Sequence, residues 1–203
     1  MPTNQIHPGD LIFFRGRDWK SRLIMAGTGP IWHRGFSHVG FASYVSGHNG
    51  LMLIDSTTLG LLPCVVTEAT SGVRARPLEQ HLAFYPGEVW VYPLDLSETA
   101  TRAPYHELGV TMAATEYATS QLGKKYDLTG AFHSRGTFLC GLLWKLGKIK
   151  ESRDALFCSE LVGNWLKIAG MLKCKNVSKL NPTTLEIMAT DQGAFREPWR
   201  WTR

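Results

Sequence analysis

The sequence predicts an α+β fold in which an antiparallel, barrel-like sheet from the first half packs on helices from the second half. Residues 1–100 hold short runs of β-forming residues separated by Gly, Asn, Ser and Pro. Residues 101–203 hold longer segments with helical periodicity. No repeat, low-complexity tract or linker separates the two halves, so we expect one domain over residues 1–203.

The sheet-rich half is predicted from apolar runs and the turns between them. Residues 11–14 (LIFF) form a buried run that follows the turn at Gly9 and Asp10. The segment SGHNG at 46–50 supplies turn residues between two β-rich runs and indicates a β-hairpin. The expected extended segments are residues 11–14, 36–45, 51–57, 65–67, 72–77 and 88–92.

The helix-rich half begins after Pro104. Residues 105–123 are rich in Ala, Thr, Leu and Met, and residues 159–169 are clearly amphipathic. Pro182 suits the first turn of a final helix. The expected helices are residues 105–123, 132–146, 159–169 and 183–189, with a shorter one at 18–26 in the first half.

Composition limits the classes of partner. The 203 residues are 44% hydrophobic, and the formal net charge is +5. A basic balance favours anionic surfaces such as lipid headgroups or cell-wall polymers. Since no helix-turn-helix, zinc-finger or aromatic-basic pattern stands out, we expect no nucleic-acid partner.

The cysteines and the first residues indicate the compartment. Cys64, Cys140, Cys158 and Cys174 include no close CxxC pair, so we expect no structural zinc and no disulfide framework. Residues 1–8 are polar and lack a signal-peptide pattern, and no run approaches the roughly 18 apolar residues of a membrane span. We therefore expect cytoplasmic synthesis, and an extracellular substrate would require lysis, a virion or a secretion system.

Cys158 is the candidate nucleophile. It lies in FCSELV at 157–162, where Ser159 and Glu160 mark the start of a helix. The unpaired N–H groups and partial positive charge of a helix start favour the thiolate form of a cysteine placed there. A buried core cysteine is the alternative interpretation, because Cys158 shares an apolar stripe with Val162 and Leu166.

His38 is the candidate general base, within FSHVGF at 36–41. A strand this apolar accepts an imidazole either as a hydrogen-bonded core residue or as a functional one. With the hairpin centred near Ser46 and Gly47, position 38 is expected opposite about 55, where Asp55 could orient the ring. Glu68 is the rival carboxylate on the next extended segment. Tyr126 could present its hydroxyl to the site, or Asp127 beside it could simply cap a helix.

These motifs together resemble the circularly permuted branch of the NlpC-type, papain-like cysteine hydrolases, related to YiiX-like and lecithin:retinol acyltransferase-like proteins. The matching segments are GDLIFF at 9–14, SHVG at 37–40, GV at 72–73 with PL at 77–78, YD at 126–127 and FCSELV at 157–162. The histidine strand precedes the cysteine helix, which is the permuted order. The resemblance covers about residues 8–170.

The resemblance implies a permuted papain-like fold with Cys158 as nucleophile, His38 as base and Asp55 or Glu68 as third residue, with Tyr126 as an oxyanion or substrate contact. It implies acyl transfer through a thioacyl-enzyme, without metal or organic cofactor. A peptidoglycan or peptide endopeptidase or amidase is the first expectation. A lipid-directed deacylase, thioesterase or acyltransferase and a non-catalytic binding or virion module are the alternatives.

Overall fold

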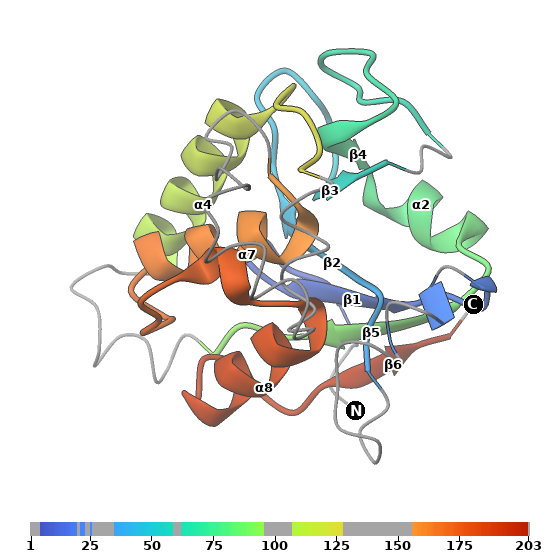
Figure 1. The fold of residues 1–203 in the computed structure, drawn as a ribbon. Helices are drawn as coiled ribbons and strands as arrows, with labels where there is room; N and C mark the ends of the chain where they lie inside the picture. The colour runs from blue at the N-terminus through green and yellow to red at the C-terminus, as the bar shows by residue number, and fades with distance from the viewer. Residues whose placement is uncertain are drawn as a thin grey trace, which may run out of the picture.

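The computed structural model describes residues 5–19, 21–22, 25, 35–58, 62–95, 107–127 and 156–202. Within these residues it contains a six-stranded sheet and four α-helices, which confirms the α+β class (Figure 1). The helix expected at 18–26 lies partly outside the described residues. The helix expected at 132–146, with Cys140, lies wholly outside them.

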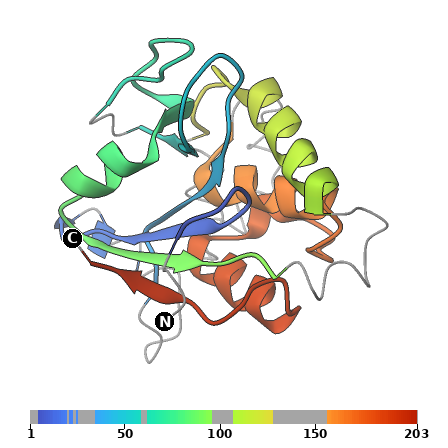
Figure 2. The same cartoon turned by 180° about the vertical axis from the view of Figure 1, so that it is seen from behind.

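The sheet has the strand order β4-β3-β2-β1-β5-β6, and its recorded pairs are antiparallel. Figure 2 shows β5 between β1 and the C-terminal β6, so the two ends of the described chain lie in one sheet. The strands are β1 (Leu11–Arg15), β2 (His38–Ser43), β3 (Met52–Thr57), β4 (Gly72–Pro77), β5 (Glu88–Tyr92) and β6 (Trp199–Trp201).

Helices cover both faces of this sheet. Helix α7 packs on β2 and β3 with α4 and α8 beside it, while α2 covers the other face (Figure 1). Their bounds are α2 (Leu78–Phe84), α4 (Glu107–Gln121), α7 (Cys158–Ile168) and α8 (Pro182–Asp191), with a short 3-10 helix η1 (Val177–Lys179) before α8.

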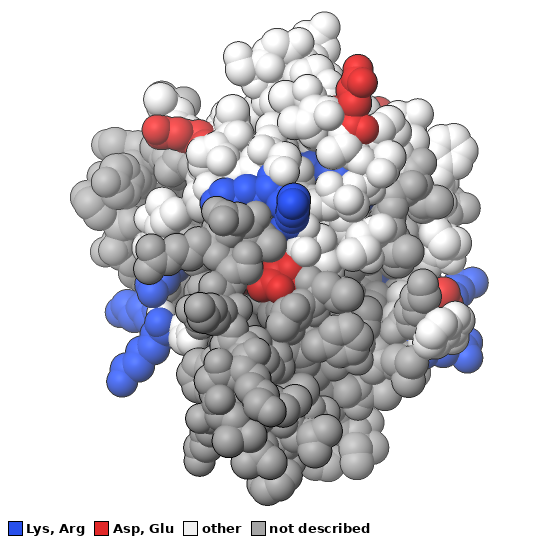
Figure 3. Space-filling view, turned by 45° about the horizontal axis from the view of Figure 1, so that its top comes forward, with Lys and Arg blue, Asp and Glu red and all other residues white. Residues whose placement is uncertain are grey.

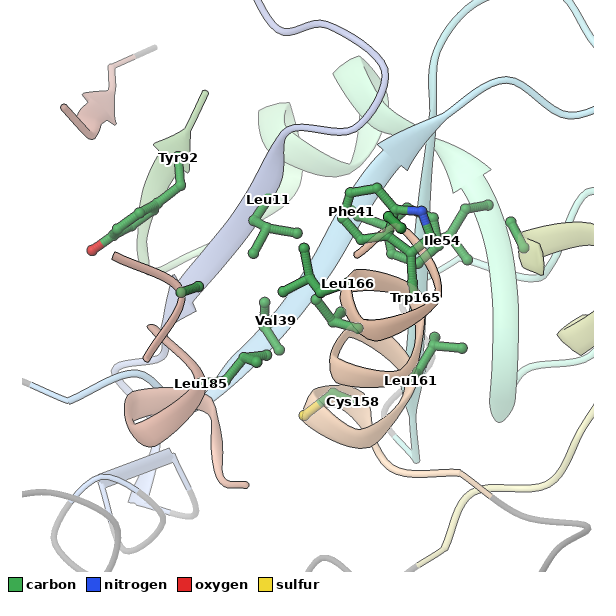
Figure 4. Close-up of a cluster of buried hydrophobic side chains, with 14 of the residues drawn as sticks. Leu11, Val39, Phe41, Ile54, Tyr92, Cys158, Leu161, Trp165, Leu166 and Leu185 are labelled. Carbon is green, nitrogen blue, oxygen red and sulfur yellow. The ribbon is translucent and has the colours of Figure 1, made fainter. Parts of the chain in front are cut away.

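Both faces of the central strands are therefore buried. In β1, Leu11 and Phe13 join the core under α7, whereas Ile12 and Phe14 join the core under α2. This explains why LIFF is a continuous apolar run rather than an alternating one. On the α7 side, Phe41 and Trp165 stack with ring centroids 4.9 Å apart (Figure 4).

One local prediction was wrong, and two elements were not predicted. Residues 65–67 form a turn, closed by the bond from the Glu68 amide to the Cys64 carbonyl, and the chain continues to turn through Glu68 at φ +56° and Gly72 at φ +89° before β4. Residues 78–84 form helix α2, whose buried Leu78 and Leu82 recur at helical spacing. Residues 199–201 form β6, where the alternation Trp-Arg-Trp places both Trp rings on the α2 side of the sheet.

Replacing Trp165 with Ala should lower the free energy of unfolding by about 3–5 kcal/mol, because the substitution leaves a large cavity between α7 and β2. Trp165 is fully buried. Urea unfolding followed by circular dichroism measures the change. Ile168→Ala is the matched control, since Ile168 lies on the same helix and is 57% exposed. A Trp165→Ala loss no larger than that of the control would contradict this packing.

Candidate active site

Cys158 is the first residue of α7, which confirms that this thiol lies at a helix start. The preceding Phe157 is extended, with φ −95° and ψ 168°, and its side chain provides no cap. The first helical hydrogen bond runs from the Leu161 amide to the Phe157 carbonyl at 3.0 Å. The amides of residues 158–160 consequently have no acceptor within the helix and are directed to its N-terminal end.

The backbone around this helix start is held from three sides. The Leu156 amide donates to the Lys125 carbonyl at 2.9 Å. The Leu156 carbonyl accepts from the Ser56 hydroxyl of β3 at 2.5 Å. One residue into the helix, the buried Ser159 hydroxyl donates to the Leu180 carbonyl at 2.6 Å. These bonds fix where the thiol stands relative to the sheet.

His38 is the first residue of β2, and its ring lies between a carboxylate and the thiol. Its Nε2 is 2.8 Å from Asp55 Oδ2. Its ring also hydrogen-bonds the Cys158 side chain. Because Asp55 occupies Nε2, Nδ1 is the nitrogen left for the sulfur. Figure 4 shows the Cys158 sulfur pointing toward the side on which Val39 of β2 lies.

The hairpin register differs by two residues from the predicted one. Gly40, not His38, stands opposite Asp55, because the hairpin turns one residue later than expected. His38 and Asp55 are therefore diagonal neighbours on one face of the sheet. Gly40 makes this approach possible, since a Cβ there would lie 2.7 Å from the Ile54 carbonyl oxygen and 3.1 Å from Asp55 Cβ.

The charges on and around His38 and Asp55 stabilise one another. Burial opposes ionisation of Asp55, but the Arg76 guanidinium and then His38 hold the pKa of this carboxyl well below its usual range. Burial likewise opposes the charged form of His38, yet a Cys158 thiolate and the Asp55 carboxylate raise the pKa of His38 to about 9. The arrangement therefore favours an imidazolium beside the sulfur at neutral pH.

Two further residues complete the group, and the sequence reasoning did not find them. Arg76 of β4 donates from Nη2 to Asp55 Oδ2. Its Nη1 lies 3.1 Å from Nδ1 of His81 in α2. A signal was present, because a buried acid on β3 requires a cationic partner. The arginines at 74 and 76 recur with strand spacing on the next strand, on the face that Asp55 occupies.

The other two candidates lie in different surroundings. Glu68 is exposed in the turn before β4, with φ +56°, so Asp55 is the carboxylate that contacts His38. Tyr126 is half-buried, and its neighbours Lys125 and Asp127 both hydrogen-bond the backbone of Leu156. Tyr126 thus lies in a segment that runs beside the start of α7. The helix that Asp127 was expected to cap lies outside the described residues.

Within the described parts of the chain, no cluster of three or more His, Cys, Asp or Glu side chains able to hold a metal occurs. None of the helices described is long and apolar enough to span a membrane. On the face in Figure 3, Lys and Arg side chains stand in separate groups with Asp and Glu near some of them, so charge alone identifies no partner.

No protein-family model and no curated protein matches this chain. Among solved structures, the fold is similar to that of YiiX from Escherichia coli O157:H7, which is described as a metalloprotein of DUF1105. The TM-score is 0.50 at 20% sequence identity, and the match covers 83% of this chain and 71% of YiiX. At this identity the likeness concerns the fold alone, and it agrees with the expected YiiX-like, papain-like architecture.

Proposed function

We propose that this protein is a cysteine hydrolase of the permuted NlpC type that cleaves an amide bond through a thioacyl-enzyme, with a peptide or peptidoglycan stem as substrate. The observation that carries the proposal is the connected series of Cys158, His38 and Asp55 at an uncapped helix start. The order of the histidine strand and the cysteine helix supports the permutation. The pairing of β6 with β5 supports one domain over residues 1–203.

In the proposed reaction the Cys158 thiolate attacks the carbonyl carbon of the amide. The oxyanion that forms accepts hydrogen bonds from the backbone amides at the start of α7. His38, as imidazolium, protonates the leaving nitrogen, and the C–N bond breaks to give a thioester. Water then attacks the thioester while the neutral His38 takes its proton as general base, which releases the acid and restores the thiolate and the imidazolium. Asp55 orients the ring throughout.

Labelling by iodoacetamide tests the thiolate. Cys158 should label fast even below about pH 7, because the Asp55 carboxylate favours the cationic form of His38, and a cationic ring beside the sulfur stabilises the thiolate. His38→Ala should slow Cys158 labelling by about tenfold or more at pH 7. Mass spectrometry follows each cysteine separately. Cys174 is the internal control, and its rate should not change. Cys158 labelling no faster than that of Cys174 would support a non-catalytic binding module instead.

Ser56→Ala should slow Cys158 labelling about three- to tenfold and cost about 1–3 kcal/mol of stability, because the Leu156 carbonyl loses its side-chain donor. Ser43→Ala is a matched control. Ser43 is also a fully buried serine, on the adjacent strand β2, and its hydroxyl bonds Tyr44 and Thr115 rather than the helix start. Equal slowing in both variants would show that general destabilisation, not placement of the nucleophile, causes the effect.

The substrate class is tested with purified peptidoglycan, peptides and acyl lipids. The wild-type chain should release new amino and carboxyl termini from peptidoglycan or peptide, and Cys158→Ser should abolish this release. Intact-mass analysis of acid-quenched samples should show a peptidyl adduct on Cys158. An adduct of fatty-acyl mass with no peptide cleavage would replace the amide substrate with a lipid one. The absence of any Cys158-dependent turnover or adduct on all three would contradict the proposal.

A further inference from the structure

The acid that contacts His38 is itself held by a second charged residue. Asp55 Oδ2 accepts from both His38 and Arg76. Asp55 and Arg76 are 0% and 1% exposed. Three further contacts lead away from the thiol, from Arg76 to His81 and from His81 to the aromatic rings of Phe14 and Tyr85. The contacts therefore form a chain from α7 through β2, β3 and β4 to α2.

The direction of each hydrogen bond is consistent with the charges. Burial and then the adjacent Arg76 lower the pKa of His81 to about 4, so His81 is neutral near pH 7 and its Nδ1 can accept from the guanidinium. Arg76 in turn is the strongest of the groups that favour the ionised form of Asp55. A buried carboxylate without such a partner takes up a proton instead. Loss of Arg76 should thus weaken the hydrogen bond between Asp55 and His38.

We propose that Arg76 is a positioning residue of the catalytic site, which keeps the Asp55 carboxylate charged and turned toward His38. The inference rests on the function proposed above. It extends the site from three residues to four and gives a role to a buried arginine on β4. Arg76 acts through Asp55 and does not touch the reacting atoms.

Arg74 provides the comparison that isolates this role. It is also a fully buried arginine on β4, and it stands opposite Asp55 in the register. Its Nη1, however, donates to the carbonyls of Leu62 at 3.1 Å and Thr70 at 2.6 Å. Four other charged or titratable groups influence His38 and Asp55. They are Cys158 of α7, Arg74 and Arg76 of β4, and His81 of α2.

The test is an NMR titration of the His38 ring in the full chain, in wild type, Arg76→Gln, Asp55→Asn and the double variant. In Arg76→Gln the pKa of His38 should fall from about 9 by about one unit or more. Cys158 labelling at pH 7 should slow by about tenfold. In the Asp55→Asn background, Arg76→Gln should add no further shift, because the residue through which Arg76 acts is already neutral.

Two controls distinguish a positioning role of Arg76 from a merely structural one. Arg74→Gln removes an equally buried guanidinium and should shift the pKa of His38 by less than half as much as Arg76→Gln. If Arg76→Gln does not fold, the cycle is run with Arg76→Lys, which keeps the charge but cannot contact both Asp55 and His81. Arg76→Lys should then shift the pKa of His38 by less than the amount expected for Arg76→Gln, and this shift should disappear in the Asp55→Asn background. Equal shifts for Arg74 and Arg76, additive shifts in the cycle or no shift would overturn the inference.

The labelling and titration results distinguish failure of the hydrolase proposal from failure of the role proposed for Arg76. The His38 titration requires no substrate, and the effect of Arg76 is the difference in the His38 pKa between wild type and variant, whatever the Cys158 thiolate contributes to the starting value. If Cys158 labels slowly in the wild type, the hydrolase proposal is rejected, while the titration still measures how the pKa of His38 depends on Arg76. If Cys158 labels fast and His38 titrates identically in wild type and Arg76→Gln, the hydrolase proposal stands and the role of Arg76 is rejected.

Discussion

The buried carboxylate of Asp55 is the constraint on which the arrangement of this site depends. An ionised carboxyl without exposed surface is costly, and removing one partner of such a group typically costs 3–5 kcal/mol. The cost is offset only when both neighbouring strands place a donor against it. His38 comes from β2 and Arg76 from β4, so the central hairpin and the β3–β4 pair must both be in register. Gly40 supplies the space that the diagonal contact needs.

Strand β3 also connects the His38 imidazole to the Cys158 thiol. Successive side chains of a strand point to opposite faces, so Asp55 and Ser56 serve different sides of the sheet. Asp55 contacts His38 on the face covered by α2, and Ser56 holds the Leu156 carbonyl on the face covered by α7. The positions of the imidazole and of the thiol are thus fixed by two adjacent residues. A register slip in β3 would misplace both groups together.

Much of this follows from the sequence, and the failures have physical causes. Strand β5 and the start of α7 were predicted because apolar runs and the polar step after Cys158 are local signals. The contact between His38 and Asp55 was expected from hairpin geometry, although the register was two residues off. Arg76 was missed since its role depends on a contact between strands that no local pattern encodes. Helix α2 and β6 were missed because seven-residue and three-residue elements depend on packing more than on periodicity.

The start of α7 illustrates how such a site departs from optimal stability. A helix preceded by Ser, Thr, Asp or Asn gains about 1 kcal/mol from capping, and Phe157 gives up that gain. The fold instead anchors the turn through Ser56, Ser159 and Lys125, none of which uses the amides of residues 158–160. The Cys158 thiol lies at this helix start, and His38 of β2 contacts its side chain. Under the proposed function, the positive surroundings that favour the Cys158 thiolate would also favour the oxyanion that forms when the thiolate attacks, so one preorganised field would stabilise both negative charges in turn.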